Sequence, residues 1–139
     1  MTIVTDDCNR TIRKLPSHHS MLAQAIAACR GARSTSRELD ATIAFAVFPA
    51  LNELRNLEPG IWQAADGSHV RALRYSDTWR AAATLPPAGH WIDIEGGIVS
   101  VTGPEGFWTA QHQSLTIALC IASLKAKVAE LRPQINLKR

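Results

Sequence analysis

The sequence contains little of what marks a secreted, disulfide-bonded or membrane-spanning protein. Its 139 residues include only three cysteines, an odd number with no C-x-x-C pair, so neither a disulfide framework nor a zinc ribbon is expected. No apolar run approaches the ~20 residues of a membrane span. The first ten residues, MTIVTDDCNR, contain two aspartates and no apolar stretch, so no signal peptide is expected. We therefore expect a cytoplasmic protein with reduced thiols and no membrane contact.

A strong excess of charge of one sign is also missing. The net charge is +3, from fifteen basic and twelve acidic residues, which by itself indicates neither a nucleic-acid nor a membrane surface. Hydrophobic residues make up 46% and charged residues 19% of the chain, a balance typical of a globular protein. The length suffices for one domain with its own core. We predict a flexible N-terminal arm (1–16), a single α+β domain (17–131) and a basic C-terminal tail (132–139).

Three segments have the periodicity and the capping residues of helices. Ser17 is a good N-cap for a helix that ends near Gly31. The capping box Thr35-Ser36-Arg37-Glu38 begins a second helix. We expect a kink or a restart at Pro49, with the apolar face continuing until Pro59-Gly60. Ser114 begins the third, which runs to Leu131 and is apolar on most sides in its first half. This last helix is expected to be central to the core, with no chemical role.

Between the second and third helices, strand signals dominate. Residues 61–73 predict a hairpin around Asp66-Gly67, because Asp-Gly suits a type I′ turn. A short helix is expected between Ser76 and Pro86, and three further strands follow at 90–95, 98–101 and 107–111. The predicted fold class is α+β, with one antiparallel sheet of about 4–5 strands sandwiched between helices and preceded by an N-terminal helical segment. Trp91 and Trp108 favour helices on both sides of the sheet, since a one-sided sheet would expose them.

Three local patterns together resemble one known family. Arg37-Glu38-Leu39-Asp40 with Ala41, Ile43 and Ala44 resembles the GRELDALVA helix start of the phage ABA sandwich domain. Arg74-Tyr75-Ser76-Asp77 with Ala81 and Ala82 is similar to its PRYSTDIAAA segment, and residues 117–126 (IALCIASLKA) resemble its closing AICRAALLA helix. The order of the three patterns agrees, and together they span roughly residues 36–128. Ser36 replaces the family's Gly, no Pro precedes Arg74, and Ile121 stands where an Arg is usual.

The resemblance implies an accessory protein of a phage or prophage, with a sheet between helical layers. It implies no catalytic residues, so none is carried over to this chain. A small protein of this kind is expected to act on a component of the bacterial host.

Signatures of catalysis are missing from the sequence. It contains no G-x-S-x-G, H-E-x-x-H or Walker motif, and no glycine-rich dinucleotide loop between a strand and a helix. We therefore assign no catalytic residue, no metal ligand and no cofactor. An acid–base site built from Asp93 and Glu95 with His90 and His112 is the lowest-ranked alternative, because side chains next to a glycine turn are expected to be solvated.

Aromatic residues are few, but all four tryptophans lie between residues 62 and 108, close to several arginines. Packing in the core accounts for them without any function. The alternative is a pocket in which aromatic rings and guanidinium groups hold a nucleobase, a nucleotide or a partner's side chain. The candidate ligand- or partner-binding residues are Arg71, Arg74, Tyr75, Trp79, Trp91, Trp108 and His112.

The sequence therefore favours a non-catalytic binding module that binds or inhibits a host protein, conceivably a defence component, or binds a small nucleotide-like ligand. The alternative is a regulator associated with nucleic acid, which would use the basic residues around 10–37 and the tail 132–139. Whether the chain forms a homo-oligomer is left open.

Overall fold

The computed structural model describes residues 17–131, which contain four α-helices and two separate three-stranded antiparallel sheets. The predicted arm 1–16 and tail 132–139 lie outside the described residues. The α+β class is confirmed. In chain order the elements are α1 (His18–Gly31), α2 (Arg37–Val47), the 3₁₀ helix η2 (Pro49–Glu53), β1 (Arg55–Glu58), β2 (Ile61–Gln63), β3 (His69–Arg71), α3 (Trp79–Ala82), β4 (Trp91–Glu95), β5 (Ile98–Gly103), β6 (Gly106–Gln111) and α4 (Leu115–Glu130).

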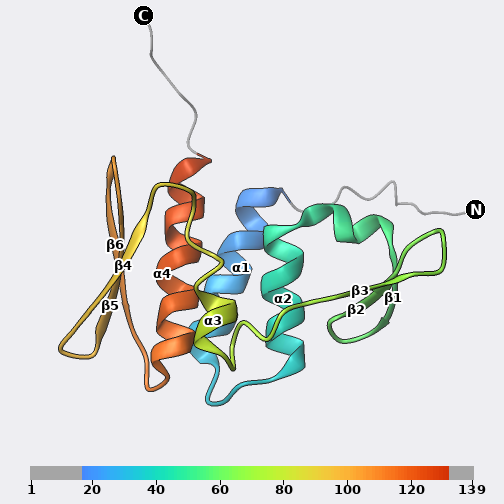
Figure 1. Cartoon of the computed structure of the whole chain (residues 1–139), viewed down its shortest axis with the longest axis horizontal. Helices are drawn as coiled ribbons and strands as arrows, with labels where there is room; N and C mark the ends of the chain where they lie inside the picture. Colours follow the sequence, from blue (N-terminus) through green and yellow to red (C-terminus); the bar gives the residue numbers. More distant parts are fainter. Residues whose placement is uncertain (1–16, 132–139) are drawn as a thin grey trace, which may run out of the picture.

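The helices lie between the two sheets. Figure 1 shows the β4–β5–β6 sheet at one end of the molecule, followed by α4, then α1 with α3, then α2, and the β1–β2–β3 sheet at the other end. The prediction of one sheet of four to five strands between helices was therefore wrong, because the six strands divide into two sheets. Short turns within β1–β2–β3 and within β4–β5–β6 favour pairing between neighbouring strands of the same group. None of the described strands of one group is hydrogen-bonded to a strand of the other group.

The serine caps begin the helices as the sequence indicates. The hydroxyls of Ser17, Ser36 and Ser114 accept hydrogen bonds from backbone N–H groups three residues further on, at 3.0, 3.0 and 3.1 Å. α4 has nine buried residues, including Leu119 and Leu124, which confirms its central position. Within residues 17–131, the search for a helix with the length and apolarity to span a bilayer finds none.

The second helix breaks and restarts at Pro49, as one of the two predicted outcomes, but its apolar face does not continue to Pro59-Gly60. α2 stops at Val47, and Pro49 begins η2, so the apolar residues beyond it do not extend a helical face. Pro49 lacks the N–H that would continue the α-helical ladder, which accounts for the break. Residues 55–58 then form strand β1, which pairs with β2 and was not predicted from the sequence.

The β4–β5–β6 sheet has one face on α4 and one face in solvent. Val99, Val101 and Ala110 alternate inward and are buried. Trp108 pairs with Val101 and is half-buried on the same face, whereas Trp91 points outward and is 55% exposed. No helix of residues 17–131 covers the outer face (Figure 1), so the expectation of helices on both sides was wrong.

A buried carboxylate joins α2 to the loop before α3. Asp40 is 1% exposed, and its Oδ1 accepts hydrogen bonds from the backbone N–H of Ser76 at 2.8 Å and from the Ser76 hydroxyl at 2.7 Å. Its Oδ2 accepts from Arg37 at 2.8 Å. Arg37 also donates to the Ala72 carbonyl at 3.0 Å, so the same side chain binds the end of the β2–β3 hairpin. Every polar atom of this carboxylate therefore has a partner, as burial requires.

We expect Leu124→Ala to lower the free energy of unfolding by about 2–5 kcal/mol, because it opens a cavity against a fully buried position of α4. Chemical denaturation measures the change. Leu115→Ala on the same helix is the matched control, since Leu115 is 42% exposed, and it should change stability by less than about 1 kcal/mol. Equal effects of the two substitutions would contradict the central position of α4.

Asp40→Ala should cost about 3 kcal/mol, because it leaves the Ser76 donors and the Arg37 guanidinium without their acceptor. Asp77→Ala provides the control, since Asp77 is an exposed aspartate in the neighbouring motif. Thermal or urea unfolding of both variants tests the assignment, and a neutral Asp40→Ala would refute it.

Candidate functional site

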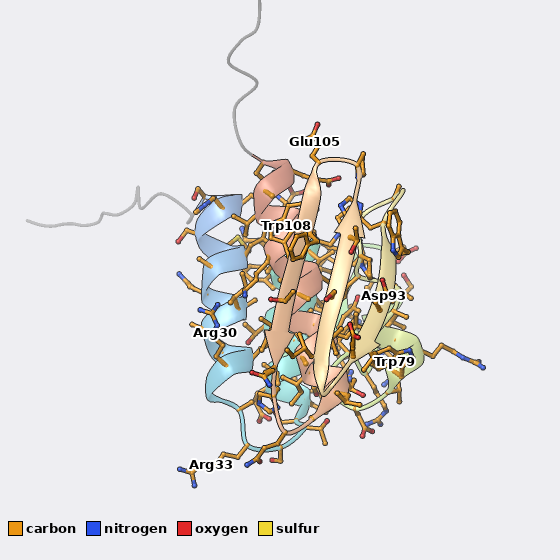
Figure 2. The ribbon with its side chains drawn as sticks, turned by 90° about the vertical axis from the view of Figure 1, so that its left-hand side faces the viewer. Arg30, Arg33, Trp79, Asp93, Glu105 and Trp108 are labelled. Carbon is orange, nitrogen blue, oxygen red and sulfur yellow. The ribbon has the colours of Figure 1, made fainter. Side chains whose placement is uncertain are left out.

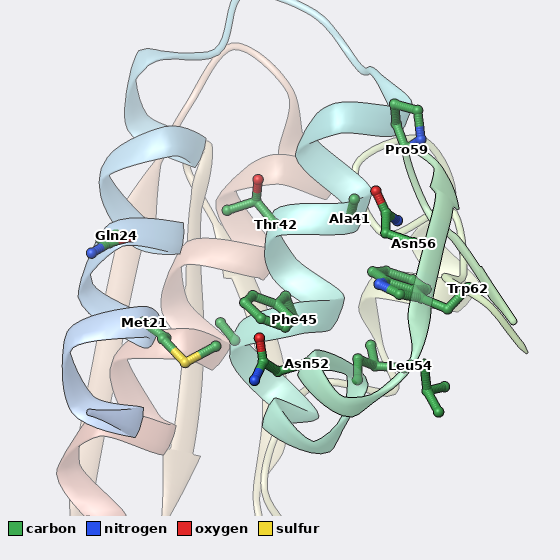
Figure 3. A pocket seen from close by; sticks show the side chains of 12 residues that line it. Met21, Gln24, Ala41, Thr42, Phe45, Asn52, Leu54, Asn56, Pro59 and Trp62 are labelled. Atoms are coloured by element: carbon green, nitrogen blue, oxygen red, sulfur yellow. The ribbon is translucent and has the colours of Figure 1, made fainter. Parts of the chain in front are cut away.

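A concave region lies between the β1–β2–β3 sheet and α2. Two cavities open there, and they share three residues, namely Leu51, Leu54 and Trp62. Trp62 lies on β2, is 5% exposed and projects from the sheet toward α2 (Figure 3). The Trp62 side chain therefore lines two adjacent cavities.

We call the first volume the amide-lined cavity; it measures about 450 Å³. Figure 3 shows it extending from α1 across α2 to the sheet, with Phe45 and Trp62 as its aromatic residues. Its polar residues are neutral: three amides and a threonine, and no residue that lines it is charged. The full lining is Met21, Gln24, Ala41, Thr42, Phe45, Ala46, Leu51, Asn52, Leu54, Asn56, Pro59 and Trp62. Its volume lies in the range of small-molecule sites.

The second volume, the apolar cavity, measures about 660 Å³ and lies between α2, η2 and β3. Phe48, Val70 and Leu73 line it and are 54%, 38% and 48% exposed, so a water-accessible apolar patch forms its rim. Its charged residues are Arg71 and Glu53, one of each sign. Exposed apolar patches of this kind mark surfaces that bind other molecules.

Two of the residues predicted from the sequence meet at the apolar cavity. Arg71 on β3 and Tyr75 in the following loop both line it. Tyr75 is only 3% exposed, and burial raises the pKa of its phenol. Arg74, between them in sequence, has an exposed side chain, while its carbonyl accepts hydrogen bonds from the backbone N–H groups of Asp77 and Thr78.

The remaining predicted residues lie elsewhere and do not share a cavity. Trp79 begins α3 and is 36% exposed, whereas Trp91 lies on the outer face of β4. Trp108 lies with its ring centroid 5.8 Å from that of His90, at a small cleft near the end of α4.

His112 contacts the loop after α1: its Nε2 donates to the Ala32 carbonyl at 2.8 Å, and its Nδ1 accepts from the Ser114 N–H at 2.9 Å. These two bonds occupy both ring nitrogens, so His112 has a structural position.

Sequence reasoning missed most of the residues that line the cavities. Phe45 lies on α2, and Asn52 and Asn56 follow the break at Pro49. Pro49 was the one feature of the sequence that could have indicated these residues. Because proline ends the α-helix, the polar residues after it need not follow the solvent-facing side of that helix. Trp62 was noticed as an aromatic residue but was not included among the candidates.

Groups that could perform chemistry are dispersed or satisfied. Within residues 17–131, no three His, Cys, Asp or Glu side chains come together in a metal-binding arrangement. Asp93 and Glu95 are exposed on the outer sheet face. Burial raises the pKa of the Cys29 thiol to about 12, with a smaller contribution from Asp40. Burial likewise raises the pKa of Cys120, whose Sγ donates to the Tyr75 carbonyl at 3.2 Å.

Comparisons with known proteins provide no further identification. No family model, no curated protein and no solved structure matches the chain significantly.

The buried thiols should be unreactive in the folded protein. The thiolate is the reactive species, and a pKa of about 12 leaves Cys29 protonated near pH 8. In a Cys8→Ser variant, Ellman's reagent should modify neither Cys29 nor Cys120 until denaturant is added, after which both react. Rapid modification of the native protein would contradict the packing of α1 against α4.

Proposed function

We propose that this chain is a non-catalytic binding module of a phage or prophage that captures a bacterial host protein through the two cavities beside Trp62. The observation that carries the proposal is the apolar rim formed by Phe48, Val70 and Leu73 around a preformed cavity. Covering these side chains removes apolar area from water, which is the main driving force of association. The resemblance to the phage ABA sandwich domain supports the phage setting.

The shape of the site favours two anchoring side chains from one partner. The cavities are adjacent and share Trp62, so neighbouring side chains of a single segment can enter both. An aliphatic or aromatic side chain suits the apolar cavity. A neutral side chain with hydrogen-bonding groups suits the amide-lined cavity, where Asn52 and Asn56 offer donors and acceptors.

A nucleotide is the less favoured ligand. Its phosphates require several cationic groups or helix N-termini. The amide-lined cavity has no charged residue, and in the apolar cavity Glu53 accompanies Arg71. We therefore prefer a protein partner over the small nucleotide-like ligand that the sequence also suggested.

A nucleic-acid-associated regulator is the second candidate. Arg30 lies in the last turn of α1, and Arg33 lies in the loop that follows it (Figure 2). The pKa of Lys125 is lowered by burial and by the nearby Arg30, which indicates that basic side chains gather on this side. Most other basic residues of this hypothesis lie in 1–16 and 132–139, outside the described residues. Its binding to DNA or RNA should weaken steeply as salt is raised.

The proposal predicts that Leu73→Glu lowers capture of the host partner about tenfold or more, because it places a carboxylate in the rim of the apolar cavity. The measurement is quantitative mass spectrometry of host-lysate proteins retained by the immobilised full chain, followed by affinity measurement with the purified partner. A photo-crosslinking residue at position 70 should link the same partner.

Leu115→Glu is the matched control, because Leu115 is similarly exposed but lies at the start of α4. The proposal expects it to retain the partner. It also expects no thermal stabilisation by a nucleotide library. If Leu73→Glu and wild type retain the same proteins equally, or if a nucleotide stabilises wild type but not Leu73→Glu, the protein-binding function is wrong.

A further inference from the structure

The outer face of the β4–β5–β6 sheet is a second exposed surface with its own chemistry. Figure 1 shows that this face lies at the end of the molecule opposite the β1–β2–β3 sheet. Trp91, Thr102 and Phe107 form one cross-strand row on it, because Trp91 pairs with Thr102 and Thr102 pairs with Phe107. Trp91 is 55% and Phe107 is 67% exposed, so two exposed aromatic side chains flank the half-buried Thr102.

This sheet is acidic within a basic protein. Residues 91–111 contain Asp93, Glu95 and Glu105 but no lysine, arginine or histidine, whereas the whole chain has a net charge of +3. Trp91, Asp93 and Glu95 occupy every second position of β4, so their side chains point to the same, outward face of the sheet. Figure 2 views the sheet from this side and shows Asp93 on β4.

The spacing suits a long cationic side chain. Strands of a sheet lie about 4.8 Å apart, so the backbones at Trp91 and Phe107 are separated by about 10 Å, with Thr102 between them. An arginine or lysine stem can lie over Thr102 between the two rings, where the aromatic faces attract its charge. Asp93 lies about 7 Å from Trp91 along the strand, within reach of the same guanidinium or ammonium group.

We propose that this face, named here the acidic aromatic face, binds an arginine- or lysine-containing segment of another protein. A second copy of the chain is a less favourable occupant, because packing two copies face to face would bring Asp93 and Glu95 of both into one interface with no cation of this sheet to neutralise them. The proposal goes beyond the function proposed above and does not depend on it. A protein that also binds through the Trp62 cavities would thereby hold two partners at opposite ends.

The test uses the full chain labelled with ¹⁵N and a capped Gly-Arg-Gly-Arg-Gly peptide, with the citrulline peptide as its neutral counterpart. We expect saturable shifts of the Trp91 indole and of the Thr102 and Phe107 amides. Replacing arginine by citrulline should weaken binding about tenfold, because it removes the charge and keeps the shape. The same loss is expected for Trp91→Ala and, to a smaller extent of about threefold, for Asp93→Asn.

Controls separate this site from general attraction between charges and from the cavities. Glu58→Gln on the exposed strand β1 and Leu73→Glu at the apolar cavity should leave peptide binding unchanged. Equal binding of the citrulline peptide, or shifts that do not saturate, would overturn the proposal. Sedimentation that shows a dimer of the wild-type chain and a monomer of Trp91→Ala would also overturn the proposal, because a second copy of the chain would then occupy this face. If Leu73→Glu loses host-protein capture but still binds the arginine peptide, the two binding sites are independent, as the proposal expects.

Discussion

The buried carboxylate of Asp40 is the interaction on which the arrangement of the helices and the β2–β3 hairpin depends. It accepts from the Ser76 backbone and hydroxyl and from Arg37, and Arg37 reaches on to the Ala72 carbonyl. Gly60 completes this contact, because a Cβ there would lie 2.7 Å from the Arg37 guanidinium. One side chain thus fixes the start of α2, the end of the hairpin and the loop that leads to α3.

The same network connects three sequence patterns that lie far apart in the chain, at residues 37–44, 74–82 and 117–126. Asp40 belongs to the first pattern and Ser76 to the second, and they are hydrogen-bonded to each other. Cys120, from the third, donates to the carbonyl of Tyr75 in the second. The three patterns therefore meet at one structural junction, and Tyr75 of this junction also lines the apolar cavity.

The two proposed binding regions arise from how unequally the sheets are covered. The β4–β5–β6 sheet packs its inner face closely on α4 and leaves its outer face to solvent (Figure 1). The β1–β2–β3 sheet is short, and only Trp62 of its strands is buried, so it stands away from α2 and leaves cavities on either side of that indole. A small chain can thus present one concave apolar site and one flat acidic site without a second domain.

Local sequence was sufficient to predict the α+β class, the helix starts at Ser17, Ser36 and Ser114, and the hairpin around Asp66-Gly67. These features depend on local capping, turn chemistry and hydrophobic period, all of which act over a few residues. Tertiary structure alone decided that the strands form two sheets, that Arg71 and Tyr75 share a cavity while Trp91 and His112 do not, and that Phe45, Asn52 and Asn56 face Trp62. These outcomes depend on pairing and packing between segments far apart in the chain, for which periodicity carries no information.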